Sequence, residues 1–106
     1  QSNFNDNLVS VEDEISNTPT EFILHQNYPN PFNPSTKISW QSPISGYQTL
    51  KVYDVLGNEV ANFVNEYKHA GSYEVDFNAS SLSSGIYFYK LQAGSFVQTK
   101  KMILIK

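Results

Sequence analysis

The chain has 106 residues, of which 40% are hydrophobic and 16% are charged, and its formal net charge is −3. This length suits one domain, and the apolar fraction is too high for a wholly disordered chain. The absence of cysteine excludes disulfides, cysteine-ligated zinc and a thiol nucleophile. The absence of arginine argues against a nucleic-acid-binding protein, and no apolar run is long enough to span a membrane.

The first 21 residues differ in composition from the rest of the chain. They contain five acidic side chains and no basic one, whereas residues 22–106 contain seven lysines against five acidic side chains. Their few apolar residues cannot build a core. We therefore expect residues 1–21 to form an acidic linker or a junction with a cargo protein, the alternative being an extra edge strand of the following domain.

From residue 22 onward the sequence predicts short strands separated by turns. A proline-rich segment at 27–36 follows the first strand, and its prolines restrict both their own φ angles and the residues before them. We expect this segment to be a stiff connection whose Phe32 covers one end of the core. The motif residues assigned to it are Asn30, Pro31, Phe32, Asn33 and Pro34.

Seven strands are expected in chain order, and they are consistent with an all-β, Ig-like antiparallel sandwich. Asp54 and Gly57 suit a tight turn after the third strand, and the alternation of the fourth strand switches near Phe63. The expected ranges are 22–24, 36–41, 48–54, 59–64, 72–77, 86–92 and 96–105. The expected interior residues are Trp40, Leu50, Val52, Val75, Phe77, Tyr87, Tyr89 and Leu91.

A tyrosine corner is expected just before the sixth strand. Residues 82–87 read L-x-x-G-x-Y, with Gly85 and Tyr87 at the last two fixed positions. In such a corner the tyrosine hydroxyl bonds to backbone a few residues upstream and holds a loop against the start of the strand. The alternative is an ordinary tyrosine on a strand.

The end of the sequence is a strand with four consecutive apolar residues between lysines. By alternation, Met102 and Leu104 face one side, while Ile103 and Ile105 face the other. Only one side can belong to the core, so the other is either covered by a loop or left for a partner. A partner could also pair with the backbone edge of this strand.

Five sequence motifs resemble a known family when they are taken together. They are NYPNPFNPST at 27–36, LKVYDVLGNEV at 50–60, AGSYEV at 70–75, LSSGIYFYKL at 82–91 and KKMILIK at 100–106. In this order they closely resemble the type A C-terminal sorting domain of the type IX secretion system, over residues 22–106. The middle part also resembles the Ig-like domain of the flagellar hook-capping protein.

The resemblance implies a seven-stranded Ig-like sandwich that serves as the address of an upstream cargo protein in the same chain. The implied partners are the outer-membrane translocon, a shuttle and a sortase-type peptidase, which commonly removes the domain. The implied route is export through the periplasm to the cell surface or medium. The residues that the resemblance assigns to translocon recognition are Lys100, Lys101, Met102, Ile103, Leu104, Ile105 and Lys106.

The residues themselves offer no enzyme chemistry and no cofactor site. His25 and His69 lack metal-site spacing, there is no nucleophile elbow, and no glycine-rich phosphate loop occurs. Glu74 and Asp76 share the solvent side of a half-buried strand, which is unsuited to a catalytic carboxylate pair.

Two other non-enzymatic functions stay open at this stage. One is a glycan- or surface-binding accessory module of a secreted enzyme, for which the aromatic side chains Trp40, Tyr47, Tyr67 and Tyr73 are available. Of these, Trp40 is expected in the core, while Tyr47 and Tyr67 are expected in exposed loops. The other is a structural Ig-like spacer.

Overall fold

The computed structural model describes residues 18–106, so most of the acidic segment expected at 1–21 lies outside the described residues. The described part is all-β, without a helix, and every pairing between its seven strands is antiparallel, which confirms the expected fold class. The strands are β1 (Ile23–Leu24), β2 (Ser35–Ser42), β3 (Gly46–Tyr53), β4 (Glu59–Lys68), β5 (Gly71–Asn78), β6 (Gly85–Ala93) and β7 (Phe96–Leu104).

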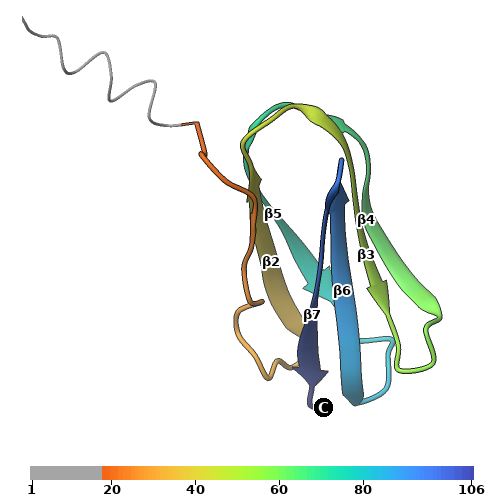
Figure 1. Ribbon diagram of the computed structural model, residues 1–106. Coiled ribbons are helices and arrows are strands. Elements are labelled where there is room, and N and C mark those ends of the chain that lie inside the picture. Colours follow the sequence, from red (N-terminus) through yellow and green to blue (C-terminus); the bar gives the residue numbers. More distant parts are fainter. Residues whose placement is uncertain (1–17) are drawn as a thin grey trace, which may run out of the picture.

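The strands form two sheets that pack as the layers of a sandwich (Figure 1). One sheet has the order β1-β2-β5 and the other has the order β4-β3-β6-β7. In an antibody constant domain the fourth strand lies beside the fifth. Here it lies beside β3, so the chain changes sheets between β4 and β5.

One of the two irregularities in the pairing of β3 with β4 explains the switch of alternation in β4. Leu50 pairs with Val64, but the next residue, Lys51, pairs with Asn62, which leaves Phe63 as an extra residue. Such a bulge moves the following side chains to the other face of the strand. The expected switch of alternation near Phe63 is thereby confirmed.

The core lies between the two sheets and has the composition expected from the alternation. Seven of the eight predicted interior residues are buried, and Val75 is half-buried because β5 is an edge strand. The buried seven are Trp40, Leu50, Val52, Phe77, Tyr87, Tyr89 and Leu91. The prediction that Tyr47 and Tyr67 lie in loops was wrong, since β3 begins two residues earlier than expected and β4 ends four residues later.

The turn after β3 is closed by the side chain of Asp54. Its carboxylate accepts hydrogen bonds from the N–H groups of Leu56 and Asn58, each at 2.9 Å. These bonds, led by the one from Asn58, lower the pKa of Asp54 because they stabilise the charged form. Gly57 has a φ of +88°, a left-handed conformation that disfavours any residue with a Cβ.

Candidate recognition surface

The last strand, β7, belongs to one layer of a two-layer sandwich, so only one of its faces can meet the core, and it lies at the edge of the four-stranded sheet. Met102 and Leu104 point inward and are fully buried. Ile103 is half-buried and Ile105 is exposed on the opposite face. The apolar run of the sequence is therefore divided between the interior and the surface.

The proline-rich segment pairs with the outer edge of β7, at the end of the sandwich where β7 terminates (Figure 1). The N–H of Phe32 donates to the carbonyl of Ile103, and the N–H of Ile105 donates to the carbonyl of Phe32, both at 2.9 Å. The Asn30 side-chain oxygen accepts a hydrogen bond from the N–H of Ile103 at 3.0 Å. Nearer the middle of β7, the Gln26 amide donates to the carbonyl of Lys101 at 2.8 Å. We call these contacts between residues 26–32 and β7 the edge clasp.

Side chains from both ends of the proline-rich segment hold it in shape. All three X–Pro peptide bonds in it are cis. The buried Asn27 amide donates to the carbonyl of Pro29 and to the Thr36 hydroxyl, which in turn donates to the same Pro29 carbonyl at 2.8 Å. Because proline lacks an N–H, these side-chain donors replace the backbone donors that a sheet would supply.

Phe32 fills the end of the core from within this segment. Its ring is buried and lies 6.0 Å from that of Phe77, measured between ring centroids. Pro31 and Asn33 on either side are exposed, and the Pro34 carbonyl accepts the N–H of Ala79 at 2.9 Å. The segment thus covers the core with a single aromatic side chain.

The turn before β6 contains the hydrogen bond of a tyrosine corner. The Tyr87 hydroxyl donates to the carbonyl of Ser83, four residues upstream, at 2.7 Å. Gly85, which begins β6, has a φ of +151° and allows the chain to turn into the strand. The same loop also holds Lys106, whose ammonium group donates to the carbonyls of Ser80 and Leu82, both at 2.7 Å.

These contacts divide the predicted recognition residues into three groups. Met102 and Leu104 are core residues, and Lys106 is bound to the loop before β6. The accessible members are exposed Lys101 and Ile105, together with half-buried Lys100 and Ile103. Sequence reasoning overlooked Ile86, which lies opposite Ile103 on β6 and is partly exposed.

Four residues lie together where β6 begins and β7 ends. We call this set, which consists of Ile86, Lys101, Ile103 and Ile105, the terminal patch. Its cross-strand pair follows from the turn at Gly94 and Ser95, because the turn sets the register of the β6–β7 hairpin. The sequence therefore held the signal that places Ile86 in the patch. It held no comparable signal for the edge clasp, because the clasp joins residues more than 70 positions apart.

The other residues considered for chemistry have structural partners. Glu74 and Asp76 lie on the outer face of β5, where the Lys37 ammonium is 3.4 Å from one and 3.7 Å from the other. The hydrogen bond to Glu74 and the charges of both carboxylates raise the pKa of Lys37. Within residues 18–106, there is no cluster of three or more histidine and acidic side chains arranged to hold a metal ion. No helix in this range has the length and apolar character needed to cross a membrane.

The four aromatic side chains considered for glycan binding do not form one row. Trp40 is buried and its ring stacks on that of half-buried Tyr73, with the centroids 5.8 Å apart. Tyr47 and Tyr67 are exposed and lie opposite each other on β3 and β4. Only two of the four are therefore available at the surface.

Comparisons with known proteins bear on this surface. A family model described as the secretion system C-terminal sorting domain matches residues 26–106. A search of curated proteins found no match. Among solved structures, the chain is similar to PorZ of Porphyromonas gingivalis, described as an essential bacterial surface component of the type IX secretion system, with 18% identity and a TM-score of 0.57. The similarity covers 78% of this chain and 11% of that protein, and at this identity it shows the fold alone.

Proposed function

The chain belongs to the family of secretion system C-terminal sorting domains, and on that basis we propose that it directs an attached cargo protein through the outer-membrane translocon of the type IX system. In this proposal the domain is not an enzyme. The cargo crosses the periplasm, passes the translocon and reaches the cell surface or the medium. The shuttle and the sortase-type peptidase of the system act on it along this route.

The observation that supports the proposal is the division of the last seven residues between core and surface. A translocon that reads a folded domain cannot contact Met102 or Leu104, because both side chains are fully buried. It can contact the terminal patch, which places aliphatic side chains beside an exposed lysine. Apolar surface bordered by polar groups is typical of a site of protein–protein interaction.

The experiment compares two single substitutions on the same face of the sheet but at opposite ends of β7. A reporter fused upstream of residues 1–106 carries either Ile105→Ser or Val97→Ser. The two side chains are 52% and 53% exposed, so each substitution removes a similar apolar surface. Val97 lies at the far end of β7 from the terminal patch and serves as the matched control.

We expect Ile105→Ser to reduce the amount of reporter at the cell surface, with reporter accumulating in the periplasm, and Val97→Ser to leave export unchanged. Thermal melts of both purified domains confirm that each stays folded, since an exposed side chain contributes little to stability. Normal export of the folded Ile105→Ser protein would show that the terminal patch is not the surface read by the translocon.

A further inference from the structure

The turn between β3 and β4 exposes two aliphatic side chains. Val55 and Leu56 are 65% and 82% exposed. Besides the two bonds to the Asp54 carboxylate, the Gly57 N–H donates to the Asp54 carbonyl at 3.0 Å and the Asp54 N–H donates to the Asn58 carbonyl at 2.9 Å. None of these bonds uses the side chain of Val55 or Leu56, so a polar residue at either position would leave the turn closed. The fold of the domain therefore does not explain why these two residues are apolar.

The turn lies at the same end of the four-stranded sheet as the terminal patch (Figure 1). Tyr53, the last residue of β3, pairs with Phe88 of β6, and Ile86 lies two residues before Phe88 on the same face. Both aromatic side chains are half-buried. They connect the turn to the patch across neighbouring strands, since β3 and β7 are only about 10 Å apart. We call this surface the apolar stripe; it consists of Tyr53, Leu56, Ile86, Phe88, Ile103 and Ile105.

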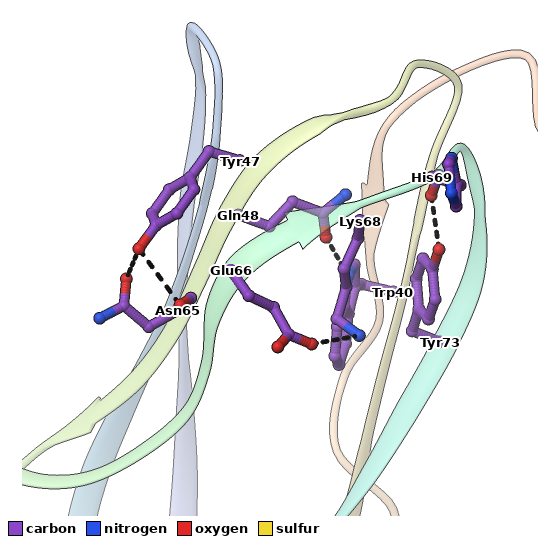
Figure 2. Close-up of polar contacts among 8 residues, drawn as sticks. All are labelled: Trp40, Tyr47, Gln48, Asn65, Glu66, Lys68, His69 and Tyr73. Carbon is purple, nitrogen blue, oxygen red and sulfur yellow. Dashed lines mark hydrogen bonds and ion pairs between the residues drawn. The ribbon is translucent and has the colours of Figure 1, made fainter.

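The opposite end of the sandwich differs, because its aromatic rings have polar partners within the domain (Figure 2). The hydroxyl of exposed Tyr47 lies against the backbone and side-chain oxygens of Asn65. The Tyr73 hydroxyl donates to the carbonyl of His69 at 2.5 Å. Such bonds account for the positions of these rings, whereas the aliphatic side chain of Leu56 has no group that could form one.

The border of the apolar stripe is positively charged. Lys51 and Lys90 lie directly opposite each other on β3 and β6, and the Lys90 ammonium is 5.7 Å from the centroid of the Tyr53 ring. Like charges in this position destabilise a sheet. Among the ion pairs within residues 18–106, Lys51 is paired with Glu59 at 3.5 Å, and none includes Lys90 or Lys101. Carboxylates supplied by a partner would offset the repulsion between these lysines.

From these features we infer that the partner that recognises this domain contacts Leu56 as a second apolar anchor beside the terminal patch. Its contact surface is an aliphatic groove bordered by carboxylates, which complements both the apolar stripe and the lysines around it. The inference rests on the proposed sorting function, since the partner is the outer-membrane translocon. An interface of standard size covers about 800 Å² on each partner, so a single partner can contact the turn and the terminal patch together.

The closed turn favours this role. The hydrogen bonds of Asp54 fix the backbone on both sides of Leu56 before any partner arrives. An anchor on a fixed backbone loses less conformational freedom on binding than one on a mobile loop. Leu56→Ser leaves this backbone intact, because any residue other than proline supplies the N–H that Asp54 accepts. The substitution therefore removes the apolar side chain without opening the turn.

The test is a competition in cells that export a reporter fused upstream of the unchanged chain. A copy of the 106-residue chain without a reporter is directed to the periplasm at graded levels, where it occupies the partner and reduces the reporter at the cell surface. We expect a Leu56→Ser copy to need a level at least about fivefold higher for the same reduction, as for the loss of an interface anchor. Ile44→Ser is the matched control, since Ile44 is also exposed but lies at the opposite end of β3.

A second pair of variants tests the carboxylate border. Lys90→Gln should weaken the competition about twofold to fivefold, which is the range expected for one ion pair at a surface. Lys37→Gln removes the same charge from β2, in the other sheet, and should compete as well as the unchanged chain. Thermal melts of all purified copies establish that each one is folded.

The outcomes separate this inference from the proposed function. Weaker competition by Ile105→Ser, with full competition by folded Leu56→Ser, would overturn the inference and leave the terminal patch as the recognised surface. No competition by the unchanged copy would contradict both. Equal competition by Lys90→Gln and the unchanged chain would overturn the carboxylate border.

Discussion

Replacing Tyr89 by phenylalanine removes one oxygen atom that connects the two sheets. Tyr89 belongs to β6, and its hydroxyl donates to the carbonyl of His25 at 2.7 Å and accepts the N–H of Asn27 at 2.8 Å. The partners lie in the segment between β1 and β2, so the hydroxyl joins the four-stranded sheet to the start of the clasp. Both Tyr89 and Asn27 are buried.

The two lost hydrogen bonds differ in cost. The His25 carbonyl belongs to an exposed residue and can be hydrated, so its loss costs about 1 kcal/mol. The Asn27 N–H is left buried without an acceptor, which costs about 1–3 kcal/mol more. We expect Tyr89→Phe to lower the free energy of unfolding by about 2–4 kcal/mol, a large part of the roughly 5–15 kcal/mol that stabilises a typical domain.

Urea denaturation followed by Trp40 fluorescence measures this loss. The midpoint should fall by about 1–2 M, given a dependence of about 2 kcal/mol per molar urea, which is the middle of the typical range. Tyr87→Phe is the comparison, because its hydroxyl bonds to the carbonyl of exposed Ser83 and its loss should cost only about 1 kcal/mol. Equal costs for the two substitutions would refute the reasoning that the stranded Asn27 N–H dominates.

The Tyr89 hydroxyl also makes the free energy of unfolding depend on pH in the alkaline range. Burial raises the pKa of Tyr89 to about 12, whereas an unfolded tyrosine titrates near 10. Between these values the folded chain keeps a proton that the unfolded chain releases, so the stabilisation is complete below about pH 10 and is lost as pH rises through about 12. The unchanged chain should therefore lose roughly 3 kcal/mol more than Tyr89→Phe over this interval.

Three further outcomes follow from the packing and the turns. Phe32→Ala should destabilise the domain by about 3–5 kcal/mol in thermal melts, because it empties the end of the core; a loss below about 1 kcal/mol would contradict this. Asp54→Ala should lower the urea midpoint more at pH 7 than at pH 2, because the lowered pKa of Asp54 stabilises the fold above about pH 4 and this contribution is lost as pH falls through the folded-state value; equal shifts at the two pH values would contradict this. Deletion of Met102–Lys106 should abolish the circular dichroism of the folded domain, since it removes two fully buried side chains; a folded truncation product would disprove it.

The sequence predicted the local structure well because each strand carries its own alternation and each turn its own chemistry. Val75 and Phe77 alternate with acidic residues, and this pattern alone places them toward the core. The boundaries of β3 and β4 were less predictable. Tyr47 and Tyr67 follow polar, turn-like residues, but pairing with each other extends both strands beyond the alternating region.

For segments far apart in the sequence, the type of local structure could be predicted, but the segment that each one contacts could not. The composition of the proline-rich segment indicated a stiff connection with Phe32 over the core, but nothing local indicated that it would pair with β7. Gln48 is a second case, because a glutamine between Tyr47 and Thr49 gives no sign that it will be buried beside Trp40. Its partner lies on a different sheet, and only the packing of the two layers brings them together.

The clasp also has a consequence for the order in which the domain folds. Its hydrogen bonds from Gln26 and Asn30 to β7 join residues 75 and 73 positions apart. Closing such long loops early is entropically unfavourable, whereas the β6–β7 hairpin needs only a short turn. We therefore expect the hairpin to form first and residues 26–32 to dock on it after the rate-limiting step. Weakening the clasp, as in Asn30→Ala, should then accelerate unfolding while leaving the refolding rate nearly unchanged. The lifetime of the folded domain would accordingly depend on how strongly this segment is held, because it must detach before the rate-limiting step of unfolding is reached.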